Sequence, residues 1–119
     1  MQELIAYILY SIALIEERFE HIGSVDDFTD THLGLEKLDA ISMRLQSIGE
    51  AIKGILKRDP EVLLEKKERS YWSNIIKLRE IISHHYVDID AEIIYDICTD
   101  ELADLKVSIN QIKKEMSCN

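Results

Sequence analysis

Seven apolar residues recur every three or four positions across the middle of the chain, and this spacing is the strongest constraint on the fold. The series is Leu35, Leu38, Ile41, Leu45, Ile48, Ile52 and Ile55. Such spacing places apolar side chains on one face of an α-helix. No segment shows sustained alternation of apolar and polar residues, and the chain contains one proline and four glycines. We therefore expect an all-α fold.

Helical spacing and capping residues also predict the other helices and the connections between them. Asp30 or Thr31 is expected to cap the central helix, and Gly49 inside it indicates close helix packing or contact with a partner. Before it we expect a helix from Gln2 to Ile22, stopped by Gly23, and a connection over residues 24–31. After it we expect a short helix from Asp59-Pro60 to near Arg69, and then a helix from residues 70–73 to the His84-His85 pair. The last helix is expected to run from Asp88 or Asp90 to Met116, with an interruption at Thr99-Asp100.

The length of 119 residues predicts one domain, residues 1–119, folded as an antiparallel bundle of four to five helices. The segment from Leu4 to Ile15 is almost continuously apolar but too short to span a bilayer. Its wide apolar face indicates either a subunit interface or deep burial within one chain. Because the start lacks a basic leader and the two cysteines lack metal or redox spacing, we expect a cytoplasmic protein without a membrane partner.

The charge distribution is uneven. The net charge of −9 argues against nucleic-acid binding, because neutralising phosphates requires Lys and Arg. Residues 53–79, however, contain eight basic and four acidic residues, which gives a local charge of +4. This basic segment fits either an RNA-facing surface or a solvated helix face.

The basic segment leads directly into the pattern Arg79-x-x-x-x-His84-x-Tyr86. On an ideal helix, five residues correspond to about 7.5 Å of rise and roughly 140° of rotation. Arg79 and His84 would therefore not share a face unless the helix ended between them. Taken alone, the pattern also allows a structural interpretation, with Arg79 as a cation near a helix C-terminus, His84 as a loop residue and Tyr86 as a half-buried aromatic residue.

Several segments in the same order resemble the HEPN superfamily, and within it the HepT-like ribonuclease toxins. These are Phe28 after an acidic pair, Ile48-Gly49-Glu50-Ala51, Trp72 before the motif, the Arg79–Tyr86 motif itself, and Asp88-Ile89-Asp90 with Glu92-Ile93-Ile94 after it. The resemblance runs from about residue 3 to about residue 112.

The resemblance implies a dimeric, metal-independent endoribonuclease without a cofactor. His84 would be the acid/base, Arg79 would bind the phosphate, and the ribose 2′-OH would attack to leave a cyclic phosphate. Two copies of the motif would meet in one cleft. The resemblance also implies a type VII-like toxin–antitoxin pair, in which a nucleotidyltransferase antitoxin attaches AMP to Tyr86 and silences the toxin.

One position departs from the family pattern. The residue after the motif arginine is commonly asparagine, whereas here it is Glu80, which would pair with Arg79 or repel the substrate. Glu80 and His85 are therefore assigned supporting positions beside the site. The alternative function is a non-catalytic HEPN subunit that holds the substrate or partner of a two-component nucleotidyltransferase.

Metal chemistry has weaker support in the sequence. His84, His85, Asp88 and Asp90 contain suitable ligand atoms but form no specific metal pattern. A di-iron carboxylate bundle requires Glu-x-x-His on two helices, and this spacing does not occur in the chain. We therefore expect no metal site.

Overall fold

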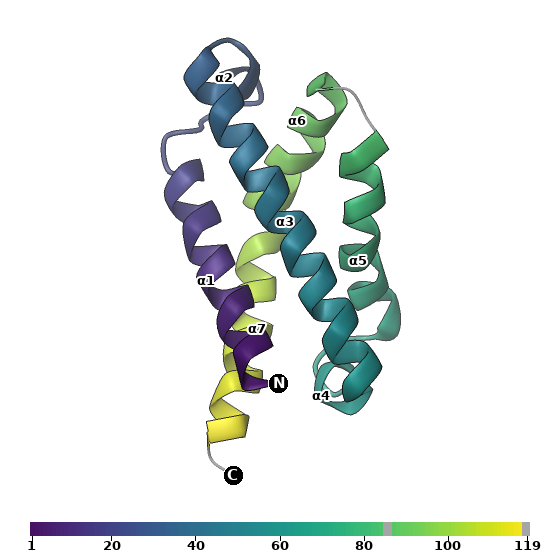
Figure 1. The fold of residues 1–119 in the computed structure, drawn as a ribbon. Coiled ribbons are helices and arrows are strands. Elements are labelled where there is room, and N and C mark those ends of the chain that lie inside the picture. The colour runs from purple at the N-terminus through teal and green to yellow at the C-terminus, as the bar shows by residue number, and fades with distance from the viewer. Residues whose placement is uncertain (85–86, 118–119) are drawn as a thin grey trace.

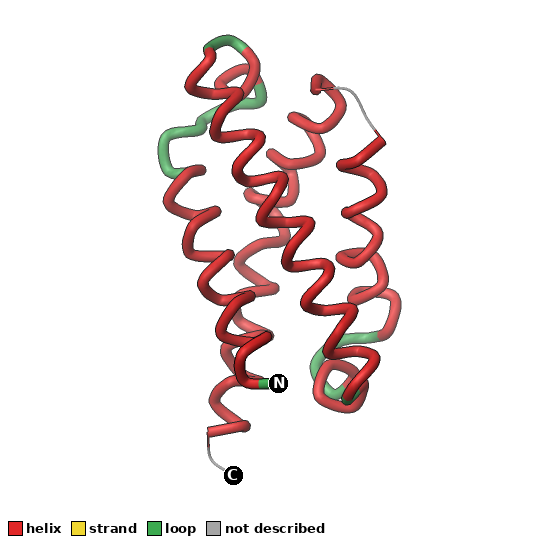
Figure 2. Tube along the Cα trace, viewed as in Figure 1, coloured by secondary structure: helices red, strands yellow, loops and turns green. Residues whose placement is uncertain are grey.

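The computed structural model describes residues 1–84 and 87–117, and describes side chains there except at positions 79–84 and 87–90. Helices dominate these ranges, and no strand occurs in them (Figure 2). In chain order they are α1 (Gln2–Phe19), α2 (Asp26–Thr29), α3 (His32–Arg58), α4 (Pro60–Leu64), α5 (Arg69–His84), α6 (Val87–Asp96), the π-helix η1 (Ile97–Glu101) and α7 (Leu102–Ser117). The all-α prediction is confirmed.

The long helix α3 is the centre of the bundle. It packs against α1 on one side and α5 on the other, and also contacts α2, α4 and α6. Figure 1 shows α3 crossing in front of the α6–η1–α7 arm, with α1 and α5 flanking it. Helix α7 in turn packs against α1. The motif helix α5 is therefore held mainly by its contact with α3.

The start of α3 follows the capping prediction, whereas the end of α1 does not. Thr31 caps α3, because its Oγ1 accepts a hydrogen bond from the Gly34 amide at 2.9 Å. Helix α1 ends at Phe19 instead of Ile22, and Gly23 has no positive φ, so its expected role as a left-handed stop is wrong. The Asp27 carboxylate accepts the amide of Gly23 at 2.7 Å and that of the next residue at 3.2 Å, which draws the chain into a turn.

Two short helices differ from the sequence prediction. The expected connection over residues 24–31 contains α2, whose Phe28 is completely buried. Helix α4 ends at Leu64 and not near Arg69, because the amides of Lys66 and Lys67 both turn back to the Leu63 carbonyl. These segments are short, so tertiary contacts decide their ends more than helix propensity does.

The last helical stretch is interrupted where the sequence indicated. Residues 97–101 form one π-helical segment between α6 and α7. The Thr99 hydroxyl donates to the carbonyls of Tyr95 at 3.0 Å and Asp96 at 3.2 Å, and thus competes with the regular backbone ladder. The predicted interruption at Thr99-Asp100 is confirmed.

The core consists mainly of isoleucine from the long helices. The completely or almost completely buried side chains include Ile5, Ile8, Ile12 and Ile15 of α1, Ile41, Ile48, Ile52 and Ile55 of α3, and Ile109 and Ile112 of α7. The apolar segment in α1 is thus part of a bundle. Within the described ranges, none of the helices combines the length and apolar character needed to cross a membrane.

Candidate functional site

The residues singled out by the motif lie at the C-terminal end of α5. Arg79, Glu80 and His84 belong to this helix, and His84 is its last residue. For these three residues the backbone is described and the side chains are not. His85 and Tyr86 lie outside the described residues, and α6 begins directly after them at Val87. The possible metal ligands Asp88 and Asp90 fall in the first turns of α6, again with the backbone alone described.

The helical backbone continues from Arg79 through His84. The helix therefore does not end between them, and their Cα atoms are separated by roughly 140° around the axis and about 7.5 Å along it. Consequently, the backbone of α5 places the two Cα atoms on different sides of the helix.

The start of α5 is held by the indole of Trp72. This side chain is completely buried, and its Nε1 donates to the carbonyls of Leu63 at 2.9 Å and Lys67 at 3.2 Å. These carbonyls belong to the end of α4 and to the turn after it. The ring of Tyr71 packs edge-on against the indole, with centroids 5.0 Å apart. Trp72 therefore fixes where the motif helix begins.

Gly49 lets α5 approach α3 closely. A Cβ atom placed on Gly49 would lie 3.2 Å from the Ile75 carbonyl oxygen and 3.6 Å from the Ile76 Cα. Both neighbours are backbone atoms of α5, which cannot move as freely as a side-chain end. Of the two explanations that the sequence left open for Gly49, close helix packing is the one the structure shows. The segment Ile48-Gly49-Glu50-Ala51 thus helps to position the motif helix.

Part of the basic segment stabilises the bundle. Lys66 forms an ion pair with Glu115, and Lys67 forms one with Asp104 at 3.2 Å, so both lysines join the α4–α5 turn to α7. The exposed basic residues of this segment include Lys53, Lys57, Arg58, Arg69 and Lys77. The basic segment therefore contributes both to the packing of the α4–α5 turn on α7 and to the solvent-facing surface.

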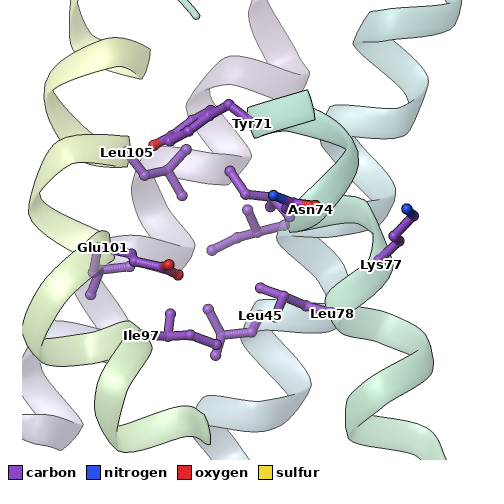
Figure 3. A pocket seen from close by; sticks show the side chains of 11 residues that line it. Leu45, Tyr71, Asn74, Lys77, Leu78, Ile97, Glu101 and Leu105 are labelled. Carbon is purple, nitrogen blue, oxygen red and sulfur yellow. The ribbon is translucent and has the colours of Figure 1, made fainter. Parts of the chain in front are cut away.

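A cavity of about 270 Å³ lies between α5 and the η1–α7 arm, with α3 as its floor (Figure 3). Its walls include Ile75 and Leu78 from α5, and Leu102 and Leu105 from α7. Leu78 immediately precedes the motif arginine. Residue spacing along the chain gives no sign of this cavity, because it is created by helices that are neighbours in space and distant in the chain.

Comparison with known proteins assigns the family. The family model described as "Ribonuclease HepT-like" matches residues 8–112, which covers most of the chain and the whole Arg79–Tyr86 motif. The chain belongs to the HepT-like ribonuclease family. The matched range agrees with the extent of the resemblance recognised in the sequence, and the helical bundle is that expected of a HepT-like protein.

Two curated relatives of this HepT-like chain come from Methanocaldococcus jannaschii. A protein named "Putative RNase" is 30% identical over 110 residues, which is 87% of this chain and 88% of the relative. A "Gamma-glutamylcyclotransferase and putative RNase" is 31% identical over 113 residues, or 95% of this chain. The HepT-like chain spans about half, 47%, of that second protein. No solved structure gives a significant match.

Proposed function

We propose that this chain is an endoribonuclease toxin that cleaves RNA without a metal ion, using Arg79 and His84. The observation that carries the proposal is its membership of the HepT-like ribonuclease family with Arg79 and His84 present in the last turns of α5. Both relatives carry the words "putative RNase" in their names, which supports the same reaction class.

The proposed reaction is transesterification followed by release of the product. The ribose 2′-OH attacks the adjacent phosphorus, so that the O2′–P bond forms and the P–O5′ bond breaks. An imidazole accepts the 2′ proton, and an imidazole donates a proton to the departing O5′. The Arg79 guanidinium binds the non-bridging oxygens and stabilises their growing charge. The products are a 2′,3′-cyclic phosphate and a 5′-hydroxyl.

The proposed active form is a homodimer. A two-fold axis beside the ends of two α5 helices would gather two arginines and two histidines, so that His84 of one copy could act as the acid/base beside Arg79 of the other. The separation of Arg79 and His84 around α5 supports a site shared between copies.

We propose that α1 contributes to the dimer interface, because apolar and aromatic side chains are exposed where α1 lies beside α3. Tyr10 and Met43 are 58% and 69% exposed. The Arg44 guanidinium lies 5.6 Å from the centroid of the Tyr10 ring and donates to the Tyr7 hydroxyl at 3.5 Å. Tyr, Met and Arg are enriched at protein interfaces.

The proposed regulator is a nucleotidyltransferase-fold antitoxin that transfers AMP to Tyr86. Tyr86 lies two residues beyond His84 in sequence, and the added phosphate would compete with RNA for Arg79. Tyr86→Phe should therefore remain toxic in the presence of the nucleotidyltransferase encoded beside it. Mass spectrometry after incubation with that enzyme, ATP and magnesium should show AMP on the wild type; equal labelling of Tyr86→Phe would disprove the assignment.

Cleavage of a labelled RNA in the presence of EDTA tests the catalytic proposal. Arg79→Ala and His84→Ala should each lower the rate by about 100-fold or more, since each removes a transition-state contact. Arg69→Ala, at the opposite end of α5, and His21→Ala, an exposed histidine, are the matched controls and should cleave at the wild-type rate. Equal rates for wild type and His84→Ala would show that the activity is contamination.

The second candidate function is a non-catalytic subunit that binds the substrate or partner of a nucleotidyltransferase. Glu80 favours this function, because a carboxyl residue directly follows, in sequence, the arginine that would hold the phosphate. Growth on expression of this chain alone separates the two functions. A ribonuclease toxin should arrest growth in a His84-dependent manner, and a binding subunit should not.

A further inference from the structure

The cavity beside the motif helix has apolar walls and a polar edge. Glu101 belongs to the π-helix, and Figure 3 shows its carboxylate extending into the space between η1 and α5. Asn74 contributes an amide from the α5 side. Lys77 also borders the cavity, but its side chain points away from the other labelled residues in Figure 3. Single π-helical turns are frequent at functional sites.

These groups fit a flat, neutral ring that carries an amino group. Aliphatic side chains can cover the faces of a planar base, while a carboxylate and an amide read its edge. The Glu101 carboxylate would repel a phosphate or another anion, but it accepts hydrogen bonds from an exocyclic amine. The volume of about 270 Å³ lies just below the range of about 300 Å³ and upward typical of drug-sized ligands, which favours a single ring system.

The position of the cavity relates it to the motif. Asn74 precedes Arg79 by five residues, which is about 7.5 Å along the helix axis and roughly 140° around it. Leu78, which also borders the cavity, directly precedes Arg79. A base held beside Leu78 would therefore belong to a nucleotide near the phosphate bound by Arg79. We propose that the cavity between α5 and η1–α7 is a base-binding subsite for an amino-bearing nucleobase, adenine, cytosine or guanine, of the RNA substrate. The inference rests on the proposed ribonuclease function.

A side chain from a protein partner is the competing occupant. An apolar side chain would fill the walls formed by Leu78 and Leu105, but it would cover the Glu101 carboxylate without giving it a hydrogen-bond donor. An amino-bearing base covers the same walls and supplies the donor. The composition of the cavity therefore favours the base.

Binding of RNA that cannot be cleaved tests the subsite separately from catalysis. The probes are 2′-O-methyl decamers of adenine, cytosine or uracil, because a methylated 2′ oxygen cannot attack the phosphate. The wild type should bind the adenine or the cytosine decamer about tenfold more tightly than the uracil decamer, which has no amino group. Glu101→Met keeps the side-chain length and removes the acceptor, so this preference should fall to less than threefold.

Two further variants make the test specific. Asp100→Asn removes a negative charge from the same π-helix at a residue that does not border the cavity, and it should keep the preference of the wild type. Leu105→Phe fills the cavity and should weaken binding of the adenine and cytosine decamers, with light scattering showing the same oligomeric state.

Three outcomes would overturn the inference. The first is equal affinity of the wild type for all three decamers. The second is that Glu101→Met keeps the wild-type preference for adenine or cytosine over uracil. The third is that Leu105→Phe dissociates an oligomer without changing this preference, which would identify the cavity as a protein contact. If any of these occurred while cleavage still depended on His84, the base subsite alone would fail. If His84→Ala cleaved RNA like the wild type, the proposed ribonuclease function would fail.

Discussion

Gly34 and Gly54 lie in the same helix, yet the space around them is very different. A Cβ on Gly34 would lie 2.0 Å from the Asp27 carbonyl oxygen and 2.9 Å from that of Phe28. A Cβ on Gly54 would meet the Leu4 Cδ1 at 3.6 Å, which is an ordinary contact. The first glycine is required by the close approach of α2, and the second is not required by its surroundings.

The two alanine substitutions should therefore have opposite effects on the free energy of unfolding. Gly54→Ala should raise it by about 0.5–1 kcal/mol, because alanine loses less backbone entropy in a helix and adds an apolar contact. Gly34→Ala should lower it by about 3 kcal/mol, because α2 must shift away from the new methyl group. Urea unfolding measures both; a Gly34→Ala protein as stable as the wild type would contradict the packing of α2 on α3.

The Cys98 thiol makes stability sensitive to alkaline pH. Burial raises the pKa of this thiol to about 12. In the unfolded chain a cysteine ionises near a pKa of about 8.5. Between these values the unfolded state has lost a proton that the folded state keeps, so the free energy of unfolding should decrease as pH rises from about 8.5 towards 12.

Urea midpoints at pH 8 and pH 10.5 check this expectation. In a Cys118→Ser background, residue 98 is the one remaining cysteine. Replacing it by Cys98→Ser should make the midpoint decrease less over this pH range than in the Cys98 protein. An identical pH dependence of the two proteins would show that the thiol is not protected by burial.

At the scale of the element, α5 is held in place by contacts at its beginning and in its middle. Its beginning is held by the Trp72 hydrogen bonds to the α4 end and the following turn, and its middle is pressed against α3 at Gly49. Its last residue is His84. Contacts at the start and in the middle of α5 therefore determine where the motif residues lie relative to the rest of the bundle.

Trp72→Phe tests this role of the indole. The variant keeps an aromatic ring but removes the indole hydrogen bonds to the carbonyls of Leu63 and Lys67 and leaves part of a completely buried site empty. It should lower the free energy of unfolding by about 2 kcal/mol. Val107→Ala, at an exposed position in α7, is the control and should change it by less than about 0.5 kcal/mol. Thermal unfolding followed by circular dichroism distinguishes the two; equal melting temperatures would show that the indole bonds are dispensable.

At the scale of the whole molecule, ion pairs join α7 to α1 and to the α4–α5 turn, and the motif helix α5 packs on one side of α3. Lys106 of α7 pairs with Glu16 of α1 at 3.0 Å, while Lys66 and Lys67 join the α4–α5 turn to α7. Helix α5 packs mainly on α3, and the cavity separates part of it from η1 and α7. The helices α1, α3 and α7 therefore form a packed bundle, and the motif helix α5 borders the cavity between itself and the η1–α7 arm.

Mixing two inactive variants tests whether the proposed site is shared between copies. If Arg79 of one copy acts with His84 of the other, a mixture of Arg79→Ala and His84→Ala chains should recover roughly a quarter of the wild-type rate, because half of the dimers are mixed and each has one intact site. Each variant alone is the control. No recovery after verified subunit exchange would show that the two residues act within one chain.

The sequence alone determined the helical class, the position of the long helices, the Thr31 cap and the interruption near Thr99. These features depend on spacing and capping within a few residues of the chain, so local rules suffice for them. The ordered motifs also indicated the family, and they placed Arg79 and His84 at the end of a helix. The roles of all five motif positions, Arg79, Glu80, His84, His85 and Tyr86, remain predictions.

Tertiary structure decided what depends on contacts between distant segments. The short helix α2 forms where the Phe28 side chain enters the core. The glycine at position 49 is explained by the backbone of α5, which lies against it. The cavity exists because α5 rests on α3 without closing on η1 and α7. The free energy of such contacts depends on which surfaces meet, and the spacing of residues along a single helix does not specify its neighbours.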